Sequence, residues 1–208
     1  YGQVAHIEIP QRDISINAFS MGLNSKLPYS VRIKRAWNVD RTFHARYSAM
    51  AREYRYFIRE GLAHDSFQEG LVTRVQKLPS IDLLNSYAKV LIGTHDFTTF
   101  CSAQDQCPSK FRDIYESEFF VEKNMYQDNL YCFRIVGNAF LYHMVRSLVG
   151  SMLCYGKNGA SKEEFEACLN SKDRSKAGTT APSDGLYLWR VSYDPEEYLW
   201  FEKEYGHD

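Results

Sequence analysis

The sequence predicts an α+β fold built on a largely antiparallel mixed sheet flanked by helices. Strand-like and helix-like segments both occur, but they do not alternate strictly, as the strands and helices of a parallel sheet do. Two strand-like segments also adjoin across a short turn, which is typical of an antiparallel hairpin. The 208 residues suffice for one large domain or for two small lobes that share a core.

The first 60 residues are expected to form three strands and one helix. Residues 3–9, 29–39 and 43–59 have the composition of strands, and the last is expected to bend near residues 49–51. Residues 13–23 are predicted to form a helix that ends before Pro28. In the third strand, alternation separates two faces, one with Tyr54, Tyr56 and Ile58, the other with Arg55, Phe57 and Arg59.

The remaining residues are expected to add three helices and three strands. Ser80 is a suitable N-cap for a helix that Gly93 ends, and Ser161 with Glu164 predicts a capping box for a short helix. These helices are expected over residues 80–92 and 161–170, with a longer one over 139–155. Strands are expected over residues 119–122 and 130–136, around a turn at 127–129, and over 185–193.

The most regular helical pattern covers residues 139–155, with Asn138 as a suitable cap. One face is apolar and is expected in the core. The other side carries His143, Arg146 and Gly150 at spacings of three and four. A glycine there lets another backbone or a ligand approach closely, and Arg146 could hold a carboxylate or phosphate through two hydrogen bonds. For the helix taken alone, a surface arginine is the simpler interpretation.

Residues 51–56 interleave tyrosines with arginines. Aromatic faces stack on bases and arginines neutralise phosphates, although this composition is also ordinary for a strand. Residues 30–60 contain eight Lys/Arg and three acids, whereas residues 194–208 contain one lysine and six acids. A chain of net charge −1 could therefore carry a local phosphate-binding face. A solvated strand pair with charged edges is the plainer explanation of the charges alone.

Other chemistry finds little support in the sequence. There is no Gly-x-Ser-x-Gly elbow, P-loop or His-Glu-x-x-His motif, so neither a nucleotide cofactor nor a metal is indicated. The five cysteines lack paired spacing, which predicts reduced thiols, and Cys101 and Cys107 fit no common zinc pattern. His95 beside Asp96 is expected to belong to a structural turn over residues 93–97. No apolar run is long enough to cross a membrane.

Five segments, in order and over nearly the whole chain, resemble the TruA-type tRNA pseudouridine synthases. Phe43-His44-Ala45-Arg46-Tyr47-Ser48-Ala49 followed by Tyr54-Arg55-Tyr56 is similar to the family's second motif. Gly137-Asn138-Ala139-Phe140-Leu141-Tyr142-His143-Met144-Val145-Arg146, with Val149-Gly150, is similar to the third. The other matching parts of the chain are residues 2–6, residues 91–100, and, near the end of the match, residues 177–178, 181–182 and 185–188.

The resemblance implies isomerisation of uridine to pseudouridine in the anticodon stem-loop of tRNA, at RNA positions 38–40, without cofactor or metal. It implies that Tyr54 packs on the target base, which must leave its stack, and that Arg146 pairs with a catalytic aspartate and keeps it ionised. Residues 30–60 would follow tRNA phosphates. The expected RNA contacts are His44, Arg46, Arg52, Arg55, Asn138 and His143. The partners implied are tRNA and a second copy of the chain in a homodimer, in the cytoplasm and without a membrane.

One departure from the family pattern concerns the nucleophile. The family carries its aspartate in a Gly-Arg-Thr-Asp loop a few residues before the segment matched by Gly2-Gln3-Val4, so this aspartate is expected upstream of Tyr1. Asp40, which precedes Phe43, is not a substitute. Residues 1–60 are then expected to be the remainder of an N-terminal lobe and residues 61–208 a C-terminal lobe. These 208 residues alone are expected to be inactive and to leave a sheet edge uncovered.

Two other functions stay open at this point. The chain could be a non-catalytic tRNA-binding module or a tRNA-folding chaperone, which would bind RNA electrostatically without turnover. It could also be an α+β protein with no role in RNA biology. Turnover of tRNA distinguishes the enzyme from the non-catalytic binding module or chaperone. Salt-dependent tRNA binding distinguishes these RNA-binding functions from a protein with no role in RNA biology.

Overall fold

The computed structural model describes residues 2–9, 14–61, 66–124 and 127–194, and it divides into two compact units. One unit is Val4–Ser48, and the other joins Tyr1–Gln3 to Ala49–Asp208. The sequence placed a boundary at residue 60 instead. The strand of residues 51–60 belongs to the larger unit because its backbone pairs with three strands there.

The larger unit is built on a six-stranded sheet in which β1 (Ala51–Glu60) is central. The strand order is β2-β1-β5-β4-β3, and β6 pairs with the first half of β1 on the same side as β2. Only the β1–β2 pairing is parallel among the described strands, so the predicted α+β fold with a largely antiparallel sheet is confirmed. The remaining strands are β2 (Thr73–Val75), β3 (Gly93–Asp96), β4 (Phe111–Lys123), β5 (Asn129–Gly137) and β6 (Leu186–Ser192).

The β4–β5 hairpin confirms the predicted strand pair and extends it. Phe119 lies opposite Phe133, and their rings are 4.7 Å apart. Gln127 adopts a positive φ of 66° in the turn, as a tight reversal requires. The pairing of β4 with β3 stops at Ile114, which lies opposite Gly93. Beyond Ile114, the outer edge of β4 has no strand neighbour among the described residues. There the side-chain amide of Asn85 donates to the Phe119 carbonyl at 2.9 Å and accepts the Phe119 N–H at 2.7 Å.

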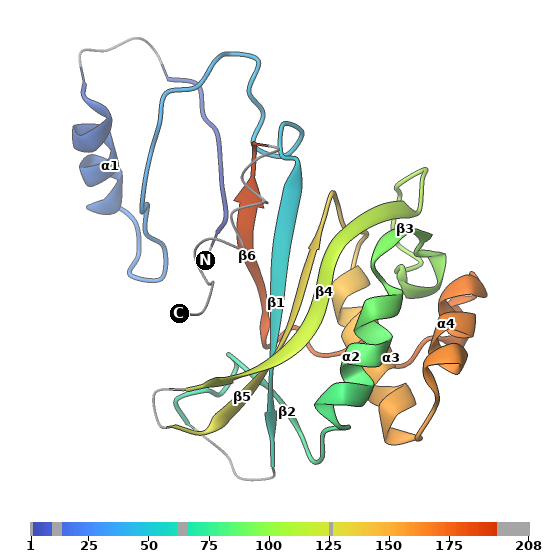
Figure 1. Cartoon of the computed structure of the whole chain (residues 1–208). Helices are drawn as coiled ribbons and strands as arrows, with labels where there is room; N and C mark the ends of the chain where they lie inside the picture. The colour runs from blue at the N-terminus through green and yellow to red at the C-terminus, as the bar shows by residue number, and fades with distance from the viewer. Residues whose placement is uncertain (1, 10–13, 62–65, 125–126, 195–208) are drawn as a thin grey trace, which may run out of the picture. The chain divides into compact units, whose positions relative to one another are not determined.

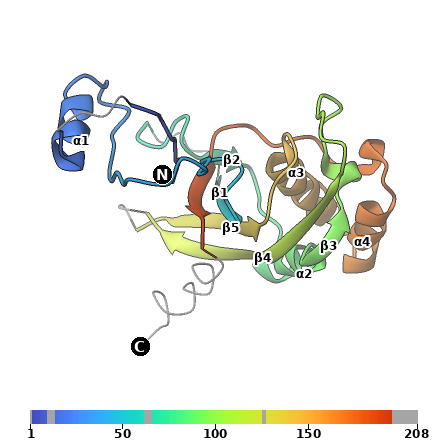
Figure 2. The ribbon, with the colours of Figure 1, turned by 90° about the horizontal axis from the view of Figure 1, so that it is seen from above.

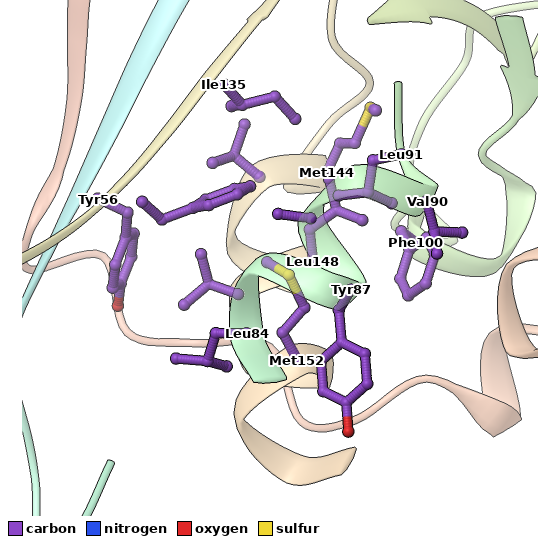
Figure 3. Packing of buried hydrophobic residues seen from close by; sticks show 14 of the residues in the cluster. Tyr56, Leu84, Tyr87, Val90, Leu91, Phe100, Ile135, Met144, Leu148 and Met152 are labelled. Atoms are coloured by element: carbon purple, nitrogen blue, oxygen red, sulfur yellow. The ribbon is translucent and has the colours of Figure 1, made fainter. Parts of the chain in front are cut away.

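Three helices cover one face of this sheet (Figures 1 and 2). They are α2 (Ile81–Val90), α3 (Met144–Lys157) and α4 (Lys162–Asn170). The caps predicted for α2 and α4 are confirmed, because Ser80 accepts a backbone N–H and Ser161 with Glu164 forms a complete capping box, whereas Asn138 does not cap α3. The buried core lies between these helices and the sheet, and Figure 3 shows Tyr56 and Ile135 of the sheet with Leu84, Leu148 and Met152 of the helices.

The helix predicted over residues 139–155 begins five residues later than expected. His143 occupies the N-cap position of α3 with φ 60°, and its side chain makes no capping bond. The residues before it are held elsewhere, since Asn138 bonds to Asp113 on β4 and the Phe140 ring packs against Tyr54 on β1. These contacts keep residues 138–143 outside the helix.

The predicted turn at residues 93–97 is wrong over its first four residues, which form strand β3 against residues 111–114 of β4. α2 ends at Val90, and Gly93 (φ 105°), which was expected to end the helix, is the first residue of β3. His95 hydrogen-bonds the Ile92 carbonyl, whereas Asp96 accepts from Thr98 at the start of η1 (Thr98–Phe100) and pairs with Lys172. The two side chains thus have separate structural partners and do not form an acid–base pair.

The smaller unit contains α1 (Ile16–Asn24), capped by Ser15, and a set of extended loops. The helix predicted over residues 13–23 is confirmed from residue 16 onward; residues 14 and 15 precede the helix, and residue 13 lies outside the described residues. Residues 3–9, 29–39 and 43–50 were predicted as strand and form none. Alternation alone does not make a strand, because each strand needs a neighbouring backbone along its length. These segments form no strand ladder in the described part of the chain, although the Met50 N–H donates to the Ser192 carbonyl of β6 at 2.9 Å.

Candidate active site

Tyr54 lies in the middle of β1, half-buried, on the face of the sheet that the helices cover. Its ring meets Phe140 edge-on, with the ring centroids 5.0 Å apart. Burial raises the pKa of the Tyr54 hydroxyl, and the charge of Arg52 opposes this shift only in part. The phenol is therefore neutral at physiological pH.

Arg146 lies in the first turn of α3 and is fastened to the chain at two points. Its Nε donates to the Ala181 carbonyl at 2.8 Å, and the Ala181 N–H donates to the Arg146 carbonyl at 3.1 Å. This pair of bonds holds the stem of the guanidinium in one orientation. No carboxylate among the described residues forms an ion pair with Arg146, so its two Nη groups are available to bind an anion.

The close approach that makes these bonds possible depends on Gly150, one turn after Arg146. A Cβ at Gly150 would stand 1.9 Å from the Thr179 carbonyl oxygen, a distance no real side chain tolerates. Gly178 is also confined, since a Cβ there would stand 2.9 Å from the Gly150 carbonyl oxygen, and its N–H donates to the Ser151 hydroxyl at 2.9 Å. The prediction that Gly150 admits another backbone is thus confirmed. We call residues 177–182, which lie along this face of α3, the closing segment.

Tyr56 links the closing segment to the sheet. Its hydroxyl donates to the Pro182 carbonyl at 2.8 Å and lies 2.5 Å from the Thr73 hydroxyl. Burial raises the pKa of Tyr56, while the Thr73 hydrogen bond and the positive charge of Arg146 oppose the increase. Tyr56 and Tyr54 lie on the same face of β1. Tyr54 contacts Phe140, and Tyr56 lies near enough to Arg146 to feel its charge, so Tyr54 and Arg146 lie on one side of the sheet.

Comparisons with known proteins bear directly on this arrangement. A family model described as tRNA pseudouridine synthase matches residues 87–194, which include Phe140, Arg146 and the closing segment. The chain is 43% identical, over 194 residues, to the tRNA pseudouridine synthase A of Anoxybacillus flavithermus, an alignment that covers 93% of this chain and 76% of that protein.

The chain belongs to the tRNA pseudouridine synthase family. It is also 39% identical over 193 residues to the tRNA pseudouridine synthase A of Bacillus subtilis, with the same coverage of 93% and 76%. The corresponding protein of Staphylococcus epidermidis is 35% identical over all 208 residues, which cover 74% of its length. These similarities confirm the resemblance that the ordered motifs indicated, and they extend over both units of the chain.

Two of the expected RNA contacts in this family member are already engaged within the protein. The Asn138 side chain donates to the Asp113 carboxylate at 2.7 Å and accepts the Asp113 N–H at 3.1 Å. Arg52 donates to the backbone carbonyls of Ala49 and Asn138. Both side chains thereby fasten the segment before α3 to β1 and β4, which disfavours a direct role in binding RNA.

Arg55 lies on the opposite face of the sheet from Tyr54, in a buried ion cluster. Its Nε donates to Glu53 at 2.7 Å, and its guanidinium covers the Trp189 ring at 4.2 Å. Glu53, whose side chain is 1% exposed, also accepts from Arg134 at 3.3 Å. Arg134 in turn binds Glu116 and Glu118. A role for Arg55 in RNA binding stays a prediction. Burial of Arg55 among carboxylates disfavours a direct contact with RNA.

The smaller unit brings His44 and Arg46 together in one tight turn. The His44 ring accepts the N–H groups of Arg46 and Tyr47 through Nδ1, at 3.1 and 3.3 Å. It also lies between the rings of His6 and Tyr47, with centroid distances of 4.4 and 4.3 Å. Arg46 covers the outer ring, that of Tyr47, at 5.8 Å. We call His6, His44, Tyr47 and Arg46 the ladder; its outer rings are exposed and His44 is half-buried. Rings beside a cation have the chemistry of a nucleic-acid contact.

Asp105 is a residue that the sequence did not single out. Its carboxylate accepts the Tyr142 N–H at 2.6 Å and the Cys107 N–H at 2.8 Å, and it pairs with Lys110 at 2.7 Å. Burial alone would raise the pKa of Asp105, but these bonds outweigh it and hold the pKa far below its usual range. No periodic pattern signals such a residue, because its main partner lies 37 positions away.

The remaining expectations concern thiols and membranes. The five cysteines form no disulfide in the structure, and reduced thiols stay a prediction. Among the described residues, no helix is long and apolar enough to cross a membrane.

Proposed function

We propose that this protein converts uridine to pseudouridine in the anticodon stem-loop of tRNA, with Tyr54 packing on the target base and Arg146 holding the catalytic carboxylate. The observation that carries the proposal is the fixed guanidinium of Arg146, on the same side of the sheet as Tyr54. Nε is bound to the Ala181 carbonyl, and no carboxylate among the described residues pairs with Arg146, so its Nη groups can bind a carboxylate.

The carboxylate in this proposal is an aspartate in a part of the protein that precedes Tyr1. A guanidinium beside it favours the charged form and so keeps it ionised and ready to attack. The reaction itself moves the bond between base and ribose from N1 to C5 of the same uracil, which requires no cofactor. Tyr54 contributes a neutral ring against the freed base, since burial raises the pKa of its hydroxyl.

RNA binding in this proposal uses the groups that the protein leaves accessible. His44 and Arg46 of the ladder suit unpaired bases and phosphates, and His143 stands at the start of the helix that carries Arg146. We further propose that the protein acts in the cytoplasm as a homodimer, whose mass in solution light scattering would measure.

The test is made on the complete protein with a tRNA transcript whose pseudouridines are mapped position by position. Wild-type protein should form pseudouridine at RNA positions 38–40, and Tyr54→Ala and Arg146→Ala should each lose at least about tenfold in kcat, which corresponds to about 1.4 kcal/mol of transition-state stabilisation. Tyr29→Ala, which removes an exposed ring, is the matched control. Salt-dependent binding without turnover in the wild type would instead favour the non-catalytic tRNA-binding module.

A further inference from the structure

The residue just before α3 has an unusual backbone. His143 adopts φ 60° and ψ 9°, the left-handed conformation that non-glycine residues seldom occupy. Such a conformation costs free energy and persists only where neighbouring contacts hold it, often at functional sites. His143 gains no capping bond from this geometry, because its side chain does not hydrogen-bond the first turn of the helix.

What the geometry does achieve is a parallel stack of two rings. The rings of Tyr142 and His143 have centroids 3.9 Å apart and an interplanar angle of 23°. Neighbouring residues in a helix or strand point their side chains in different directions, so this stack depends on the left-handed backbone between them. Tyr142 is 49% exposed and His143 is half-buried, so an aromatic surface remains open on the outside of the pair.

Asp105 holds the stack in place from a separate loop. It accepts the Tyr142 N–H through Oδ2, and the Tyr142 carbonyl accepts the Ser102 N–H at 3.1 Å. Both backbone groups of Tyr142 are therefore tied to the loop of residues 101–110. Lys110 and the Cys107 N–H bind the other carboxylate oxygen, Oδ1, and keep Asp105 from turning away.

We propose that the Tyr142–His143 pair is a nucleobase-binding platform, which takes an unpaired base of tRNA adjacent to the target uridine. This inference rests on the proposed function. Arg146 follows His143 by three residues, about one helical turn along α3, so a base on the platform belongs to a nucleotide next to the one that reacts. A preformed ring pair suits a base, since stacking needs a flat, rigid surface and is indifferent to base identity. Asp105 acts as its positioning residue.

The experiment measures the affinity of complete protein for an anticodon stem-loop RNA, with and without the bases beside the target. Tyr142→Ala and His143→Gly should each weaken binding about five- to a hundredfold, the range that loss of one stacked base covers. Tyr142→Phe keeps the ring and should bind as the wild type does. The glycine at position 143 retains the left-handed backbone, so its effect reports the imidazole ring and not the turn.

The protein variants are then combined, in a double-mutant cycle, with RNAs that lack the base at the 5′ or the 3′ neighbour of the target uridine. If the missing base is the one that stacks, Tyr142→Ala should change affinity for that RNA by less than twofold. Equal binding of the wild type and both variants, or a loss that persists with each abasic RNA, would overturn the platform. Failure of the wild type to form pseudouridine would count against the proposed function alone, because the binding cycle does not depend on turnover.

Discussion

Arg146 and Ala181 exchange two hydrogen bonds, one from the guanidinium Nε to the Ala181 carbonyl and one from the Ala181 N–H to the Arg146 carbonyl. The side chain proposed to hold the nucleophile is therefore oriented by a backbone segment 35 residues further along the chain. Predictions about this site follow from what holds that segment against α3.

Gly150→Ala should disrupt the closing segment. The new methyl group would meet the Thr179 carbonyl at 1.9 Å, so the segment must move and take the Ala181 carbonyl with it. We expect a loss of about 1–3 kcal/mol in the free energy of unfolding, as for other overpacked sites, and a fall in kcat of at least about tenfold. Urea unfolding and single-turnover kinetics on folded protein measure the two effects.

The matched control for that change is Gly22→Ala in α1. A Cβ at Gly22 meets nothing within 4 Å, so the substitution should be neutral or stabilise by up to about 1 kcal/mol. If both alanine variants behave alike, the close approach at Gly150 does not restrain the site.

Tyr56→Phe should loosen the closing segment from the sheet side. It removes the hydroxyl that bonds the Pro182 carbonyl and neighbours the buried Thr73 hydroxyl. Leaving such a partner unsatisfied costs about 1–3 kcal/mol. Thermal unfolding measures the change, and an unaltered Tm would show that this hydroxyl contributes nothing net.

Asp105→Asn should destabilise the protein in a pH-dependent way. The folded state holds the pKa of Asp105 below its ordinary value of about 3.9, so the ionised carboxylate contributes stability above that pH. This contribution is lost as the pH falls through about 4 toward the lowered folded-state pKa. The difference in Tm between wild type and variant should therefore be large at pH 7 and shrink toward pH 3.

Asp40→Asn, on an exposed loop of the smaller unit, serves as the comparison. It should change Tm little at either pH. A difference for Asp105→Asn that stays constant from pH 7 to pH 3 would contradict the role assigned to its ionised form.

Glu53→Gln should destabilise the sheet without affecting the reaction. It removes the carboxylate that Arg55 and Arg134 share in a buried place, and breaking such a group costs about 3–5 kcal/mol. Glu118→Gln, whose side chain is 51% exposed, should cost under about 1 kcal/mol. Because Glu53 lies on the opposite face from Tyr54, kcat measured below the unfolding transition should remain within about twofold of the wild type.

Local patterns in the sequence were sufficient for much of this fold. Ser80 and Ser161 predicted helix starts because capping chemistry acts within one turn, and the β4–β5 hairpin followed from two alternating segments around a short turn. Gly150 predicted a close backbone approach, although the sequence did not show that Thr179 makes it. The roles of Tyr54 and Arg146 came from the ordered motifs.

What the sequence missed depends on contacts between distant residues. The start of α3 moved to Met144 because Asn138 and Phe140 are bound to β4 and β1, which helical periodicity does not register. Residues 93–96 became a strand because β4 offers them a backbone edge. No sequence pattern indicated a role for Asp105, because its carboxylate accepts the N–H of Tyr142, which lies 37 residues away.

The amide of Asn85 has a consequence for the solution behaviour of the protein. By offering one donor and one acceptor to Phe119, it stands where a further strand would otherwise add to the open edge of β4. Exposed strand edges recruit other chains, and a side chain that satisfies one makes such recruitment costly. We therefore expect Asn85→Ala to raise the turbidity of the solution at high protein concentration before any loss of helix or sheet content is detected.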